Sequence, residues 1–200
     1  MTPQQAANLV KKQQKEIENL FNNHMPVKVG EIAKSHFKQN FRDGGFDSIG
    51  TWKKTKRQRS GSRSSSANYS PLTSGRDQLM GSINYQVGKG VVTIYNNVEY
   101  AAIHNYGGTT HPKVTPKLKR FAWAKFFEET GIKKGMTKKE RRSAEQAAGE
   151  EAKMWKSIAL TKKQHLNVKI PKRQFLGESQ ILNKKIEQEI VNQMNKILKF

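Results

Sequence analysis

SINYQVGKGVVTIY occupies residues 82–95 and carries the strongest strand signal in the chain. On each side of Gly88-Lys89-Gly90, β-branched and aromatic residues are mixed with polar ones, which is typical of two half-buried strands joined by a glycine turn. A second alternating stretch, residues 166–170, ends at Pro171, which cannot continue a central strand. We therefore expect residues 166–170 to pair with the hairpin in one antiparallel sheet.

Helical periodicity flanks this sheet on both sides. Apolar residues recur in steps of three and four over residues 3–24, 29–41 and 181–198, among Gln, Lys and Glu. Pro26 lies between the first two stretches and is expected to separate two helices, because proline lacks a backbone donor. The pattern predicts an α+β fold in which an antiparallel β-sheet is packed by N- and C-terminal amphipathic helices.

Residues 115–163, just before the second alternating stretch, are predicted to form an inserted helical hairpin. Capping signals are Thr115 with Pro116 and Gly131 for the first helix, and Thr137 with Glu140 for a second helix that continues to about Leu160. The first helix carries four aromatic residues on a wide arc, which we expect to face its own core and a neighbouring subunit: Phe121, Trp123, Phe126 and Phe127.

The chain is strongly basic, with 37 Lys and Arg against 16 Asp and Glu and a net charge of +21. Such a charge attracts nucleic acid or an acidic protein surface. The loop of residues 47–70 has no carboxylate after Asp47, and its candidate DNA-facing residues are Lys53, Lys54, Lys56, Arg57, Arg59 and Arg63. A solvated loop without a partner explains this composition equally well, and both interpretations stay open.

Residue types exclude several kinds of chemistry. The absence of Cys excludes disulfides, thiolate zinc sites and thiol nucleophiles. The five histidines do not have metal-ligand spacing, and Gly88-Lys89-Gly90 lacks the rest of a phosphate-loop motif. We therefore predict no catalytic, cofactor-binding or metal-binding residues. No apolar run approaches the roughly 20 residues that span a bilayer, so we expect a protein made in the cytoplasm that has no membrane partner.

Three motifs occur in order along the chain: PLTSGR at residues 71–76, YAAIHNYGG at 100–108 and IPKRQFLG at 170–177. In that order they resemble the phage virion morphogenesis family, the Mu-type tail-completion or head–tail joining proteins. The positions to which we assign a structural role are Gly75, Tyr100, His104, Gly107, Gly108, Pro171, Arg173 and Phe175. We expect His104 and Arg173 to bind backbone carbonyls or a neighbouring subunit, not substrate. The segment 115–163 is similar to a long insertion found in a subset of the family.

The resemblance implies a non-enzymatic virion protein, a single tail-completion domain over residues 1–200. It implies a homo-oligomeric ring, which we expect to be hexameric, at the head–tail junction around the DNA path. The implied partners are portal or connector proteins, tail tube or sheath proteins, and genomic DNA in the channel, without a cofactor. The implied location is the neck or tail of the virion, after synthesis in the bacterial host cytoplasm. The alternatives are a free-standing, sequence-independent DNA-binding protein and, third, a metal-dependent nuclease, which would need a carboxylate cluster.

Overall fold

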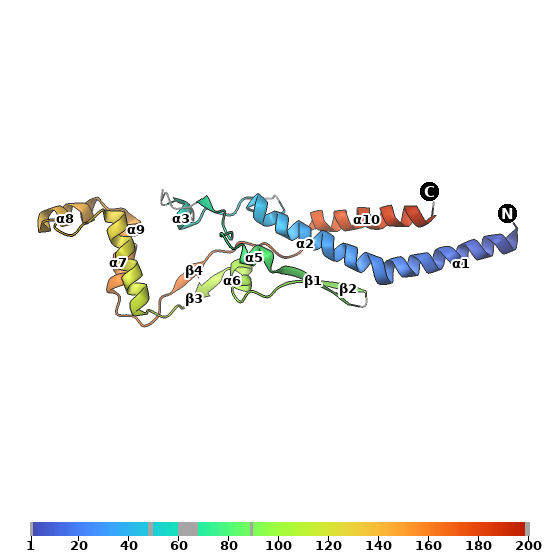
Figure 1. The fold of residues 1–200 in the computed structure, drawn as a ribbon, viewed down its shortest axis with the longest axis horizontal. Coiled ribbons are helices and arrows are strands. Elements are labelled where there is room, and N and C mark those ends of the chain that lie inside the picture. Colours follow the sequence, from blue (N-terminus) through green and yellow to red (C-terminus); the bar gives the residue numbers. More distant parts are fainter. Residues whose placement is uncertain (1, 48–49, 60–67, 89, 199–200) are drawn as a thin grey trace. The chain divides into compact units, whose positions relative to one another are not determined.

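The computed structural model describes residues 2–47, 50–59, 68–88 and 90–198. It combines helices with two small antiparallel sheets, which confirms the α+β class (Figure 1). The chain divides into two compact units. Unit 1 comprises residues 1–107 and 171–200, and unit 2 comprises residues 108–170. Each unit is described below by itself.

The N-terminal part of unit 1 is helical through Pro26. Helix α1 (Pro3–Asn19) leads into a π-helical turn, η1 (Leu20–His24), and then into α2 (Met25–Asp43). Two α-helices are present as expected, but a π-helical turn joins them in place of a break, and Pro26 lies in the first turn of α2, where no intrahelical N–H bond is required. In the wide turn before it, the Met25 N–H bonds to the Leu20 carbonyl five residues back. Helix α10 (Gln180–Leu198) packs against α1 and α2.

Two separate pairs of strands form where one sheet was expected. Strand β1 (Ile83–Gly88) pairs with β2 (Val91–Asn96), as the hairpin signal predicted. Strand β4 (Val168–Ile170), however, pairs with β3 (Gly108–Thr110), so the expected pairing of residues 166–170 with the hairpin was wrong. Alternation predicts that a segment is a strand but does not identify its partner, and here the partner is the segment that precedes the insertion.

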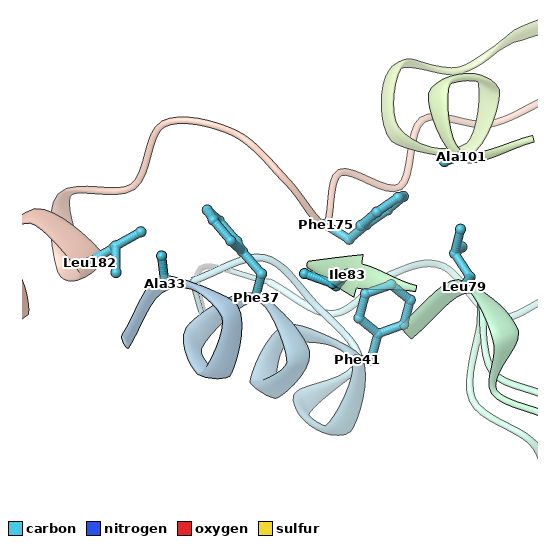
Figure 2. Close-up of a cluster of buried hydrophobic side chains, with 8 residues drawn as sticks. All are labelled: Ala33, Phe37, Phe41, Leu79, Ile83, Ala101, Phe175 and Leu182. Atoms are coloured by element: carbon cyan, nitrogen blue, oxygen red, sulfur yellow. The ribbon is translucent and has the colours of Figure 1, made fainter. Parts of the chain in front are cut away.

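The core of unit 1 lies between α2 and the hairpin. Ala33, Phe37 and Phe41 are four residues apart on α2 and therefore share one helical face. Figure 2 shows them with the other buried members of this cluster, which are Leu79, Ile83, Ala101, Phe175 and Leu182. Leu79 comes from the short helix α5 (Gln78–Gly81) and Ala101 from α6 (Ala101–Tyr106). Burial of a large apolar side chain stabilises the fold by about 1.5–3 kcal/mol.

Unit 2 is built on α7 (Pro116–Thr130), which packs against α9 (Glu150–Leu160). Thr115 caps α7 by accepting the Leu118 N–H at 3.1 Å, and Gly131 ends it in the left-handed region. The single helix expected over residues 137–160 is divided into α8 (Lys138–Ala147) and α9. The backbone is extended at Ala148 and Gly149, because Gly149 is a poor interior helical residue and a good N-cap.

Candidate functional site: an anchor segment and exposed assembly surfaces

Residues 172–176, which we call the anchor segment, pass through the centre of unit 1. Phe175 is fully buried, and its ring centroid lies 5.1 Å from that of Phe41. The side chain of Asn105 on α6 binds the backbone beside it three times. Its Oδ1 accepts the N–H groups of Phe175 and Leu176 at 2.8 and 2.9 Å, and its Nδ2 donates to the Leu176 carbonyl at 3.0 Å. One amide therefore satisfies three backbone groups that burial would otherwise leave unpaired.

Three further contacts fix the same segment. The Trp52 indole N–H donates to the Gln174 carbonyl at 3.1 Å. The Arg173 backbone N–H donates to the His104 carbonyl at 2.9 Å, and its guanidinium Nη2 donates to the Lys53 carbonyl at 3.1 Å. The motif at residues 100–108 and the motif at 170–177 thus meet, although about 70 residues of sequence separate them.

The motif glycines and Pro171 lie at backbone turns and at the ends of strands. Gly107 has φ +76°, and a Cβ there would lie 2.8 Å from the backbone nitrogen of Lys172, which only glycine permits. Gly108 begins β3 opposite Ile170, and Pro171 follows β4 directly. A Cβ at Gly75 would contact the Tyr69 hydroxyl at 3.1 Å.

His104 is half-buried between Tyr100 and Arg173. The Tyr100 ring meets the imidazole edge-on at 5.7 Å between centroids. Burial, followed by the positive charge of Arg173, lowers the pKa of His104 below its ordinary value, because both disfavour the charged imidazole. Its Nδ1 is buried without a hydrogen-bond partner among the described residues. The hydrogen bond between His104 and the anchor segment is made by the His104 backbone carbonyl.

A buried His, Asp and Ser trio joins the start of α10 to α2. Nε2 of His36 lies 2.8 Å from Asp47 Oδ1 and 3.1 Å from Ser179 Oγ. A hydrolase triad uses both ring nitrogens, one for the carboxylate and the other for the serine, whereas here both partners meet the same nitrogen. Ser179 Oγ also accepts the Leu182 N–H at 3.0 Å, which caps α10. The arrangement fits a structural role, and sequence spacing gave no sign of it.

The candidate DNA-facing residues are only partly described. Lys53, Lys54 and Arg59 are exposed, and Lys56–Arg59 forms one helical turn, α3. The side chains of Lys56 and Arg57, and the whole of Arg63, lie outside the described part of the chain. The structure brings the Lys53 backbone, not its ammonium group, to the anchor segment.

The four aromatic residues of α7 have different surroundings. Phe126 is buried, whereas Phe121 and Phe127 are 50% and 44% exposed. The Trp123 and Phe127 rings stack at 5.7 Å, and Phe121 meets Trp155 of α9 edge-on at 5.7 Å. Phe126 therefore belongs to the core of unit 2, and the exposed faces of Phe121 and Phe127 are available for contact.

Unit 1 exposes apolar side chains along its long helices. Helix α1 has no buried residue among those described, and Leu9 and Val10 are 45% and 62% exposed. Phe21, Val27 and Val191 are also exposed. A groove of about 630 Å³ is lined by residues of α1, η1, α2 and α10, among them Leu20, Val27 and Ile197. Exposed apolar surface of this kind is typical of contacts with another chain.

Among the described residues, no group of three or more His, Asp or Glu side chains could hold a metal ion. No helix in the described part of the chain is both long and apolar enough to cross a membrane.

The fold and the anchor segment define a helix-rich α+β protein with apolar side chains exposed on its longest helices. The sequence matches the phage virion morphogenesis family over residues 4–199, and the chain belongs to that family. This confirms the resemblance and makes the protein a phage morphogenesis component of a structural kind. No curated protein and no solved structure matches the chain.

Proposed function

We propose that this protein is a tail-completion subunit that forms a ring at the head–tail junction of a tailed phage. In this proposal copies of the chain surround the DNA path and contact the portal or connector on one side and the tail tube or sheath on the other. A hexamer is the stoichiometry we propose, and the subunit acts by assembly, without catalysis. Membership of the virion morphogenesis family supports a role in the particle.

The observation that carries the proposal is the exposure of α1. Helix α1 fully buries none of its 17 residues, so it gains little packing energy from its own subunit, and most helical stability in proteins comes from packing of an apolar face. Leu9 and Val10 add apolar surface to this helix that a neighbouring subunit would cover. Helix α1 therefore fits an element that is stabilised by assembly.

The strand edges support the same conclusion. Each described sheet has two strands, so each strand has one edge without a strand partner in its sheet. Exposed edges are templates for pairing with another chain, and two-stranded sheets are marginal by themselves. A closed ring would cover equivalent surfaces on every subunit.

The test is to remove the protein from the phage that encodes it and to image the particles. We expect DNA-filled heads and tails that do not join, and restoration of complete particles when the wild-type chain is supplied in trans. In complete particles, a tagged chain should be located by cryo-electron microscopy as a ring at the junction. Complete, infectious particles that lack the chain would refute the proposal.

The net charge of +21 supports a second candidate, a free-standing DNA-binding protein. Mass photometry of the purified chain separates the two. A ring-sized species favours the tail-completion subunit, whereas a monomer that binds DNA and is absent from particles favours the alternative.

A further inference from the structure

Unit 2 carries a disproportionate share of the positive charge. Residues 108–170 contain 16 of the 37 basic and 6 of the 16 acidic side chains, a net charge of +10 in 63 residues. The remaining 137 residues carry +11. The insertion is therefore about twice as densely charged as the rest of the chain.

The charge is concentrated at α8 and in the turn before it. We define the cationic surface as Lys133, Lys134, Lys138, Lys139, Arg141 and Arg142, all of which are exposed. In the described structure none of the six forms an ion pair. The one acid within this run, Glu140, accepts from the Thr137 N–H at 2.7 Å and from its hydroxyl at 2.8 Å. These hydrogen bonds lower the pKa of Glu140 and hold its carboxylate at the cap.

The stability of α8 does not explain these residues. The helix has no buried residue, so its side chains do not contribute to a core. Lys138 and Lys139 lie in the first turn, where the helix dipole disfavours positive charge by about 0.3–1 kcal/mol per residue. A cation-rich start to a helix that has no buried residue therefore indicates a partner outside the fold.

The chemistry of the surface indicates which partner. Every residue between Phe127 and Leu160 is described, and none of the large apolar side chains between them is exposed. Protein interfaces usually depend on buried aromatic or aliphatic anchors, and single-stranded nucleic acid is usually held by stacking on exposed aromatic rings. A row of exposed Lys and Arg without either feature suits the regularly spaced phosphates of a duplex.

We propose that the cationic surface of unit 2 binds the sugar-phosphate backbone of duplex nucleic acid independently of sequence. Lys138, Arg141 and Arg142 are neighbours on one face of α8, because residues three and four apart are adjacent on a helix. This assigns a binding role to the insertion. The inference does not depend on ring formation, and duplex binding can be measured without particles.

The experiment uses the full chain and two variants of equal charge. The first carries Lys138→Gln, Lys139→Gln, Arg141→Gln and Arg142→Gln. The control carries Lys11→Gln, Lys15→Gln, Lys184→Gln and Lys185→Gln, four exposed positions on α1 and α10. Each variant loses four positive charges, and glutamine preserves helix propensity. Binding of a labelled duplex of about 30 base pairs is followed by fluorescence anisotropy over a salt series.

We expect the α8 variant to reduce the slope of log K against log salt by up to about 3.6, because each of the four lost phosphate contacts contributes roughly 0.9. The control should change the slope by less than about 1. A third variant, with Lys138→Arg, Lys139→Arg, Arg141→Lys and Arg142→Lys, should bind as the wild type does. Circular dichroism checks that all four proteins have the same helix content.

Equal losses in the α8 and control variants would overturn the proposal, since only net charge would then matter. An unchanged slope in the α8 variant would overturn it as well. Polyglutamate of similar length serves as a second probe. If the α8 substitutions abolish polyglutamate binding and leave duplex binding intact, the partner is an acidic protein and the proposal is wrong.

Discussion

Asn105 satisfies three backbone groups of the anchor segment with one side chain. Asn105→Ala would leave two N–H donors and one carbonyl without these bonds, and an unsatisfied buried group costs about 1–3 kcal/mol. We expect the free energy of unfolding, measured by urea denaturation, to fall by at least about 2 kcal/mol. Asn183→Ala, at an exposed position on α10, should change it by less than about 0.5 kcal/mol. Equal effects would show that Asn105 does not hold the segment.

Gly30 of α2 lies directly against the ring of Tyr85 on β1. Alanine normally stabilises a helix interior relative to glycine by about 1 kcal/mol. A Cβ at Gly30, however, would overlap the ring of Tyr85, whose hydroxyl donates to Glu31 at 2.8 Å. We therefore expect Gly30→Ala to destabilise unit 1 by about 1–3 kcal/mol in urea denaturation.

A double-mutant cycle tests this explanation. With Tyr85→Ala the obstruction is gone, and Gly30→Ala should then stabilise the protein by about 0.5–1 kcal/mol. If Gly30→Ala destabilises to the same extent in both backgrounds, the ring of Tyr85 is not the cause.

His104 makes stability depend on pH in a definite direction. Its pKa in the folded protein is lowered, by burial first and by Arg173 second. Well above the ordinary histidine pKa of about 6.5 that applies in the unfolded chain, the histidine is neutral in both states and its contribution to stability is fully present. As the pH falls below about 6.5, the unfolded chain binds a proton before the folded one, so stability decreases until the lowered pKa is reached.

The urea concentration at the unfolding midpoint of the wild type should therefore decrease as the pH is lowered from about 7.5 to about 5.5. His104→Gln should reduce that fall, whereas His165→Gln, at an exposed position, should leave it unchanged. A decrease of the same size in the His104 variant would show that His104 does not cause this pH dependence.

At the level of elements, substitutions on α1 test the proposed assembly separately from folding. Leu9→Gln and Val10→Gln remove exposed apolar surface without a change in charge. Because α1 buries none of its described residues, the free energy of unfolding should change by less than about 0.5 kcal/mol. Sedimentation velocity should show that self-association requires a protein concentration at least about tenfold higher than for the wild type. This corresponds to a loss of roughly 1.4 kcal/mol of association free energy. Gln4→Ala with Asn8→Ala on the same helix is the control and should associate normally.

The elements that sequence predicted are those whose signals are local. Thr115 and Gly131 cap α7 as expected, and the hairpin of β1 and β2 forms around its glycine turn. The interrupted second helix could have been predicted from Gly149, which is a poor interior residue. Passage of the helix through Pro26 depends on a π-helical turn, for which the sequence carries no simple pattern.

The contacts that sequence did not predict join distant positions. Asn105 meets Phe175 and His36 meets Ser179 across 70 and 143 residues, and no periodicity links such pairs. The partner of β4 was missed for the same reason. Motif resemblance did identify residues 100–108 and 170–177, but it did not show that Asn105, inside the first motif, holds the second.

At the scale of the whole molecule, the two units have separate cores. The main cluster of unit 1 contains only residues outside 108–170. In unit 2 the buried apolar residues are Ala122, Phe126, Ala152 and Ala159. Loss of unit 2 therefore removes no member of the cluster around Phe41 and Phe175. The units should unfold independently, and each should serve a separate role.

The pairing of β3 with β4 provides a clean way to remove the insertion. Thr110 and Val168 are directly opposite each other, so residues 111–167 can be replaced by Asn-Gly, which favours a two-residue hairpin turn. The shortened chain should keep the urea transition of unit 1, since the anchor segment and its partners are unchanged. It should also self-associate as the full chain does, because α1 and α10 are retained.

The same shortened chain should lose the part of duplex binding that the α8 substitutions remove, with a similar reduction of the salt slope. That combination, normal association with weakened duplex binding, requires the two roles to reside in different units. Loss of association in a folded shortened chain would place the assembly surface in unit 2, where Phe121 and Phe127 are exposed, and not on α1. An unfolded shortened chain would instead show that unit 1 depends on the insertion for its stability, contrary to the separation of the two cores.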